Sequence, residues 1–294
     1  MTSAEPVRRT SEIEEITNLY LIHPIASWLT PLFAGLHIHP NAVSIAGMAF
    51  GVSAGVAYAQ YQDVRYAIAG FLLMIAWHVM DGADGQLARL TKTQSELGKV
   101  LDGICDYVTF IAVYAGLAVA LGRQHGEWVW PVVTAAGACH AVQAAAYELQ
   151  RQTYNFWGWA RTSAAPPGLT APPQNTTRGL ANRLHQLYAE MQTLTAGDAM
   201  AFHKRLAALL ERQPERGADI RSRYRAVFAP VVRRWSVMSS NYRTVGLFVG
   251  ALLKAPLAYF LFEIVVLTLI LVLLLSQQGR LQTQFLKSLE TAAE

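Results

Sequence analysis

Charged residues are scarce in this sequence. Asp, Glu, Lys and Arg make up 15% of its 294 residues, whereas about 25% of the residues in an average soluble domain are charged. Hydrophobic residues reach 53%, and they gather into long runs such as 244–277. This balance excludes an ordinary soluble domain and a disordered chain, and it indicates an integral membrane protein.

Cysteine is rarer still, because the chain contains only Cys105 and Cys139. Both lie in apolar helical sequence, which excludes a disulfide scaffold and gives no support to redox chemistry. Residues 1–17 lack the apolar core of a cleavable signal peptide, so we expect the N-terminus to stay in the cytoplasm. The formal charge is +4, and the excess of basic residues lies in one segment that contains no nucleic-acid motif. We therefore expect membrane lipids, and no nucleic acid, as its partner.

Six segments are long and apolar enough to cross a bilayer, which takes about 20 residues. The predicted spans are 41–60, 64–82, 97–122, 129–148, 236–254 and 257–277. Pro256 must mark a short turn between the last two, with a single kinked span as the alternative. Before the first span, apolar residues at helical spacing within 13–39 predict an interfacial amphipathic helix.

Basic residues set the predicted orientation. Arg65 and Arg123 stand alone in two of the links between spans, whereas residues 148–235 hold thirteen Lys and Arg residues. By the positive-inside rule this segment and both termini lie in the cytoplasm. The predicted fold is thus an all-α six-transmembrane-helix bundle with a cytoplasmic helical insertion, divided at 1–39, 40–148, 149–235, 236–278 and 279–294.

The predicted insertion has two parts. Residues 162–176 are rich in Pro, Ala and Thr and predict a flexible linker. Residues 178–234 show apolar residues at helical spacing with a break at Ala196-Gly197, and Asp198 would cap the second helix. We interpret this part as a basic helical hairpin on the anionic leaflet or against a partner. A solvated helical insertion without chemistry is the alternative.

Four aspartates lie within 26 positions around the junction of the second and third predicted spans. Asp81 and Asp84 are three residues apart, and Asp102 and Asp106 are four apart, so each pair shares one helix face. A charge at membrane depth is costly unless it is paired, hydrated or bound to a metal. Oxygen ligands without His or Cys suit Mg²⁺, Mn²⁺ or Ca²⁺ better than zinc. The sequence therefore predicts a divalent-metal site.

Small residues accompany these acids. Gly85, Ala88 and Gly98 remove side-chain bulk beside the carboxylates, which favours close approach of a bulky ligand over the alternative of close helix packing. His78 lies three residues before Asp81, and we interpret it as a packed histidine in preference to a metal-shell residue. Four tryptophans fit the aromatic belts at membrane boundaries: Trp28, Trp77, Trp128 and Trp130.

The complete pattern resembles the signature of class I of the CDP-alcohol phosphotransferase family. All eight signature positions are filled at the family's spacing in Asp81-x2-Asp84-Gly85-x2-Ala88-Arg89-x8-Gly98-x3-Asp102-x3-Asp106. The resemblance covers this motif and the six-span core with its N-terminal helix, and it leaves out the insertion at 151–235. It implies an enzyme of phospholipid biosynthesis that transfers a phosphoalcohol group from a CDP-alcohol to a hydroxyl acceptor. It also implies that CMP is released at the cytoplasmic side of the inner membrane.

The resemblance also implies a role for each motif position. Asp81, Asp84 and Asp102 would hold divalent ions, two Mg²⁺ or Mn²⁺, and Asp106 would be the general base while also able to bind a metal. The remaining positions would serve the CDP-alcohol, with space for the nucleotide and a cation for its phosphates: Gly85, Ala88, Gly98 and Arg89. Many members of the family are homodimers. Neither cysteine has a nearby histidine at a credible offset for a nucleophile and its base, which favours direct displacement over a covalent intermediate.

The acceptor alcohol is the open question. In branches that resemble phosphatidylglycerophosphate or inositol-phosphate synthases the residue after the fourth aspartate is commonly basic, whereas here it is Tyr107. The run 106–110 looks more like bacterial phosphatidylserine synthases. A polar cluster at 239–244 contains Asn241 and Arg243 and is a candidate acceptor pocket, with an arginine snorkelling to headgroups as the alternative.

Three functions remain open from the sequence. The first is transfer of a phosphatidyl group from CDP-diacylglycerol to a small polar alcohol. The second is transfer of a CDP-linked headgroup to a lipid hydroxyl, such as diacylglycerol or a ceramide-like acceptor. The third is divalent-cation transport, which leaves Gly85, Ala88, Arg89 and Gly98 unexplained.

Overall fold

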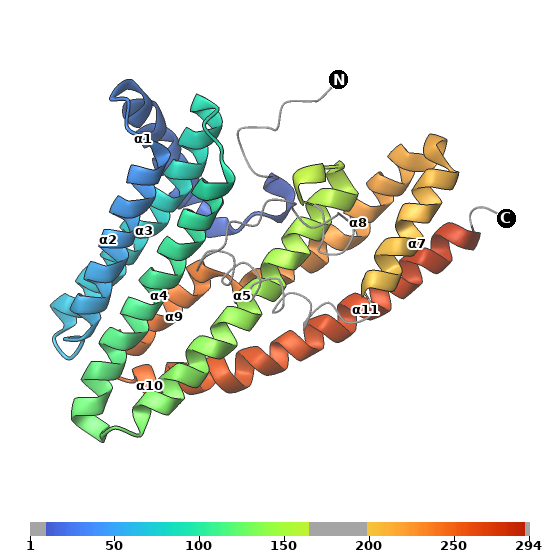
Figure 1. Ribbon diagram of the computed structural model, residues 1–294. Coiled ribbons are helices and arrows are strands. Elements are labelled where there is room, and N and C mark those ends of the chain that lie inside the picture. Colours follow the sequence, from blue (N-terminus) through green and yellow to red (C-terminus); the bar gives the residue numbers. More distant parts are fainter. Residues whose placement is uncertain (1–9, 165–198, 292–294) are drawn as a thin grey trace. The chain divides into compact units, whose positions relative to one another are not determined.

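The computed structural model describes residues 10–164 and 199–291 (Figure 1). These residues form helices and turns without a strand, which confirms the all-α prediction. The α-helices are α1 (His23–Gly35), α2 (Pro40–Tyr58), α3 (Val64–Thr91), α4 (Glu96–His125), α5 (Val129–Trp159), α7 (Ala199–Arg212), α8 (Gly217–Trp235), α9 (Ser240–Leu252), α10 (Pro256–Phe262) and α11 (Thr268–Thr291). Two π-helices, η2 (Asn18–Ile22) and η6 (Glu263–Leu267), and four short 3₁₀ helices complete them: η1 (Ser11–Ile13), η3 (Thr162–Ala164), η4 (Pro214–Arg216) and η5 (Ser236–Met238).

Five helical segments in the described part of the chain are long and apolar enough to cross a membrane. They are Pro40–Tyr58, Val64–Thr91, Leu97–His125, Val129–Trp159 and Pro256–Thr291. The chain is thus a multi-pass membrane protein by the length and composition of its helices.

The predicted span at 236–254 is not among these five, so the count of six is not confirmed. Ser239 has extended backbone (φ −75°, ψ 160°), which separates η5 from α9. Helix α9 then has 13 residues, or about 20 Å at 1.5 Å per residue, which is less than the roughly 30 Å hydrocarbon core.

The chain reverses direction after α9. Lys254 has left-handed backbone (φ 55°), and Pro256 begins α10. A Cβ added to Gly250 would lie 3.1 Å from the Cβ of Tyr259 in α10, and one added to Gly246 would overlap the Tyr259 ring. Helix α9 therefore packs against α10, as predicted from a turn at Pro256, and the two helices are not one kinked span.

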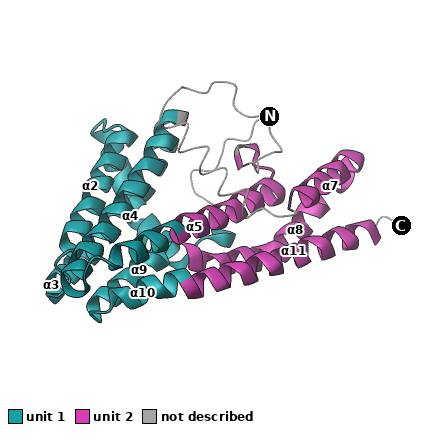
Figure 2. Cartoon of the chain, turned by 60° about the horizontal axis from the view of Figure 1, so that its bottom comes forward, with its two compact units in different colours: residues 1–138, 240–264 teal, residues 139–239, 265–294 magenta. Residues whose placement is uncertain are grey.

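The chain divides into two compact units (Figure 2). Unit 1 comprises residues 1–138 and 240–264, and unit 2 comprises residues 139–239 and 265–294. The core of unit 1 is apolar and aromatic, with Tyr58, Met74, Trp77, Val113, Leu117 and Phe260 fully or nearly fully buried. Unit 1 contains all the acids of the motif.

Unit 2 contains the insertion. Arg221 and Arg225 of α8 donate to the carbonyl oxygens of Trp157 (3.0 Å) and Gly158 (2.8 Å) at the end of α5, where terminal carbonyls need donors. Helix α7 corresponds to the second helix of the predicted hairpin, and the separate helix α8 was not predicted. The linker at 165–176, the first predicted helix and Asp198 lie outside the described residues.

The N-terminal region contains η1 and then one continuous helical run over 16–35, in which the π-helix η2 leads directly into α1. The predicted helix over 13–39 is therefore shorter at both ends, with α1 ending at Gly35. Tyr20 and Trp28 are 79% and 73% exposed, whereas Ile22 and Ala26 are buried. One side of η2 and α1 thus packs on the protein and the other presents apolar side chains, as an interfacial helix would. Its position on a membrane surface stays a prediction.

Candidate active site

Close backbone contact brings α2 against α3 and α4. A Cβ at Gly47 of α2 would lie 3.1 Å from the Cβ of Met80 in α3. At Gly55 an added Cβ would lie 2.5 Å from the carbonyl carbon of Ala112 in α4. At Gly55 only glycine allows this approach, and at Gly47 a Cβ would make an unusually tight contact, so the three helices lie at short separations.

A tight turn then sets the level of the acids on α3 and α4. Helix α3 ends at Lys92, which has left-handed backbone (φ 57°), and the Ser95 side chain caps α4 by accepting the Gly98 N–H at 3.0 Å. Asp84 lies eight residues before Lys92, and Asp102 lies seven residues after Ser95. The two acid pairs therefore face each other at similar distances from the turn.

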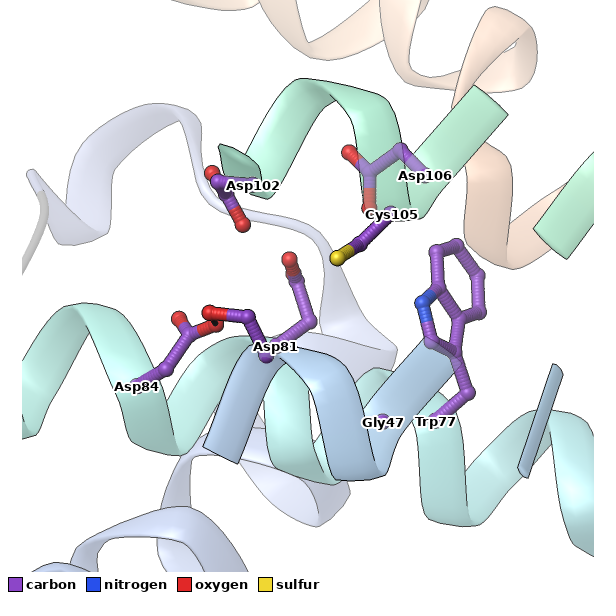
Figure 3. A pocket seen from close by; sticks show the side chains of 8 residues that line it. Gly47, Trp77, Asp81, Asp84, Asp102, Cys105 and Asp106 are labelled. Atoms are coloured by element: carbon purple, nitrogen blue, oxygen red, sulfur yellow. Dashed lines mark hydrogen bonds between the residues drawn. The ribbon is translucent and has the colours of Figure 1, made fainter. Parts of the chain in front are cut away.

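Three of the four predicted acids converge. Asp81 of α3 and Asp102 and Asp106 of α4 each offer one carboxylate oxygen, and these oxygens all lie within 4.8 Å of one another. Figure 3 shows the two pairs facing each other from their two helices. Asp84 lines the same pocket, is buried, and accepts a short hydrogen bond from the Ser44 hydroxyl of α2.

Four further residues line this pocket and were not predicted to do so: Ser44, Gly47, Trp77 and Cys105. The assignment of Trp77 to an aromatic belt is wrong, because its side chain is buried beside the acids. A signal was present in the sequence, since Trp77 precedes Asp81 by four residues and therefore shares its helix face. Ser44 has no comparable signal, because its helix α2 carries no acid of the motif.

The geometry suits a hard divalent cation. Oxygens on opposite sides of one Mg²⁺ or Mn²⁺ lie roughly 4 Å apart, twice a metal–oxygen distance of about 2.1 Å, and the three carboxylate oxygens lie within 4.8 Å of one another. An acidic cluster of this kind is compatible with a metal that neutralises its charge.

Comparison with known families agrees with this site. Residues 37–170 match the CDP-alcohol phosphatidyltransferase family. The match includes all four aspartates and confirms the resemblance seen in the sequence for this part of the chain. Members of this family are transferases that move a phosphate-containing group from a CDP-alcohol to an alcohol acceptor, and they use divalent metals. No curated protein sequence matches the chain.

The other positions of the family motif are not among the residues that line the pocket. Gly85 lies beneath the Arg89 guanidinium, since an added Cβ would be 3.4 Å from Arg89 Nη1. Gly98 faces Asn41 of α2, with 3.6 Å between its added Cβ and the amide oxygen. Ala88 is half-buried. Their roles toward the CDP-alcohol stay predictions.

The candidate acceptor residues have partners within unit 1. The Asn241 amide donates to Glu15 Oε2 at 2.7 Å and to Asn18 Oδ1 at 2.8 Å. Arg243 is 1% exposed and forms an ion pair with Glu263. A snorkelling arginine is therefore wrong for Arg243, and the acceptor-pocket prediction gains no support from these contacts.

His78 is a packed residue, as interpreted from the sequence. It is buried, and its Nε2 lies 2.9 Å from the hydroxyl oxygen of Thr244 in α9. Helix α9 thus contacts α3 one helical turn before Asp81.

Proposed function

We propose that the protein is a membrane enzyme of phospholipid biosynthesis that transfers the phosphatidyl group of CDP-diacylglycerol to a hydroxyl acceptor and releases CMP. The observation that carries this proposal is the convergence of Asp81, Asp102 and Asp106 inside the region that matches the family. Three carboxylates at one site in an apolar bundle are costly unless they are paired, hydrated or bound to a cation, and a divalent cation held there would serve the proposed reaction.

The metal ligands we propose are Asp81, Asp84, Asp102 and Asp106, holding two Mg²⁺ or Mn²⁺ ions. When bound, such ions would neutralise the charge that develops on the pyrophosphate oxygens during displacement. The short hydrogen bond from Ser44 supports this assignment for Asp84, because it orients the Asp84 carboxylate within the pocket, as partners of metal ligands do.

Asp106 is the proposed general base. Its carboxylate takes the proton of the acceptor hydroxyl as that oxygen attacks the phosphorus that carries the diacylglycerol group. The bond from this phosphorus to the bridging oxygen of the pyrophosphate breaks, and CMP leaves with that oxygen. Support comes from the spacing, since Asp106 is one helical turn beyond Asp102 and farther from the nucleotide end marked by Gly85 and Arg89.

The nucleotide end of the site is proposed at the start of α4 and the end of α3. The small residues Gly85, Ala88 and Gly98 leave space there, and Arg89 supplies a positive charge for phosphate oxygens. We place this end at the cytoplasmic side of the inner membrane because the insertion at 148–235 carries thirteen basic residues.

The test is release of CMP by the purified protein in lipid nanodiscs. CDP-diacylglycerol is offered with a panel of alcohols that includes serine, glycerol 3-phosphate and inositol phosphate. In a second arm, CDP-linked headgroups are offered with diacylglycerol or ceramide. CMP release in the first arm alone supports the proposal, and release in the second arm alone favours headgroup transfer. Passage of Mn²⁺ into liposomes without CMP release in either arm would favour transport.

A further inference from the structure

A buried ion pair lies in unit 1 outside the acid pocket. Arg243 of α9 pairs with Glu263 at the start of η6, and their exposed fractions are 1% and 0%. Tyr114 of α4 donates its hydroxyl to Glu263 Oε2 at 2.6 Å, while Arg243 contacts Oε1. Replacing such pairs by apolar residues is often neutral for stability. A pair kept at this depth therefore points to a role in fixing one arrangement of α4, α9 and η6.

A column of aromatic rings connects Tyr114 with the acid pocket. Trp77, which lines the pocket, packs edge-on against Phe110 with ring centroids 5.3 Å apart. Phe110 packs on Tyr114 at 6.4 Å, and Tyr114 packs on Phe260 of α10 at 5.1 Å. Phe110 follows Asp106 by one helical turn. The column of rings therefore extends from the ion pair to Trp77, which lines the pocket.

A second connection reaches α3. Thr244 directly follows Arg243 and contacts His78 at 2.9 Å, and His78 precedes Asp81 by three residues. Helix α9 thus holds α3 through His78, and with η6 it holds α4 through Tyr114. The two helices that carry the acids share one support.

We propose that Arg243 and Glu263, acting through Tyr114, are positioning residues. They fix the position of α4 along its axis relative to α3 and so keep Asp106 opposite Asp81. The metal-binding consequence rests on the proposed function, whereas the pocket geometry can be measured without metal or substrate. Loss of this support should loosen the pocket and weaken cation binding without removing any ligand.

Two variants break the support while avoiding an unpaired buried charge. Tyr114→Phe removes one hydroxyl and leaves the ion pair in place. The double variant Arg243→Met/Glu263→Gln removes both charges together and keeps an acceptor for Tyr114. The matched control is Tyr61→Phe, since Tyr61 is also buried and donates to Gln124 of the same helix α4 at 3.1 Å. Gln124 lies about 27 Å along α4 from Asp106, at 1.5 Å per residue.

Cys105 provides the reporter, because its thiol is buried and lines the pocket. In a Cys139→Ser background, the rate of its reaction with iodoacetamide is measured in nanodiscs without metal, well below the melting temperature. Tyr114→Phe and the double variant should raise this rate by about threefold or more through local opening, and Tyr61→Phe should leave it unchanged. Mn²⁺ affinity, measured by electron paramagnetic resonance, should fall about tenfold in the first two, as for other residues that orient metal ligands.

The proposal is overturned if Cys105 reacts at the wild-type rate in both variants, or if Tyr61→Phe accelerates it equally. Faster labelling with unchanged Mn²⁺ affinity would overturn it as well, because the acids would then have kept their spacing. If the wild type binds no Mn²⁺, the proposed metal site is wrong, and the labelling rates alone decide the positioning role.

Discussion

The crossing of α2 and α4 leaves no room for a side chain at Gly55, and this permits a sharp prediction. In a Gly55→Ala variant the new Cβ would lie 2.5 Å from the carbonyl carbon of Ala112 and 3.0 Å from the amide nitrogen of Val113. Carbon atoms pack at about 3.5–4.0 Å. Both obstacles are backbone atoms, so no rotamer change relieves the overlap, and α2 must move by about 1 Å relative to α4.

The expected size of the effect follows from this displacement. Overpacking of this kind costs about 1–3 kcal/mol, and the higher helix propensity of alanine offsets up to about 1 kcal/mol of it. The moving helix also carries Ser44, the partner of Asp84. Because misplacing reactive groups by about 1 Å can cost about 10²-fold in rate, we expect CMP release to fall by about 10- to 10²-fold.

The assay combines a thermal melt with CMP release in the same nanodiscs. The control is Gly279→Ala in α11, where an added Cβ would meet no atom within 4 Å. This control should keep wild-type activity and melt at the same or a higher temperature. Wild-type activity together with an undiminished melting temperature in Gly55→Ala would refute the reasoning.

Three other predictions concern the acids and one histidine. Asp106→Asn should lower kcat by about 10²–10⁴-fold with CDP-alcohol affinity changed much less; recovery to near the wild-type rate on Mg²⁺ titration would instead make Asp106 only a metal ligand. Asp81→Asn and Asp102→Asn should each weaken metal and nucleotide binding together, and normal nucleotide affinity in both would show that they are not ligands. In unit 2, burial lowers the pKa of His203 to about 4, so the folded state loses stability as the pH falls from about 6.5, where the unfolded histidine titrates, towards 4. Melts at pH 7 and pH 5 should differ by about 2 kcal/mol from this residue and by less in His203→Gln, and an equal acid sensitivity of both proteins would contradict this.

The acid site was the most predictable part of the molecule. The spacing of three and four residues placed each aspartate pair on one helix face, and the short segment between the helices made the faces meet. This logic is local, and the convergence of Asp81, Asp102 and Asp106 bears it out. The hydrogen bond from Ser44 to Asp84 could not be foreseen, because it joins two residues forty positions apart on different helices, and no periodicity in the sequence marks such a pair.

The predicted span at 236–254 is not confirmed, for a physical reason. Hydropathy does not register the extended backbone at Ser239 or the left-handed residue Lys254, which limit α9 to 13 residues. The ion pair of Arg243 could not be predicted from the sequence either, because its partner Glu263 lies twenty positions away, beyond the turn between α9 and α10.

The central claim is that Asp81, Asp102 and Asp106 hold a divalent ion on which phosphatidyl transfer depends. The direct measurement is CMP release from CDP-diacylglycerol, with the acceptor that the panel identifies, first in EDTA and then with added Mg²⁺ or Mn²⁺. Because the proposed ion would neutralise the charge that develops on the pyrophosphate during transfer, we predict that EDTA abolishes CMP release and that Mg²⁺ or Mn²⁺ restores it. Full CMP release in EDTA would contradict the account.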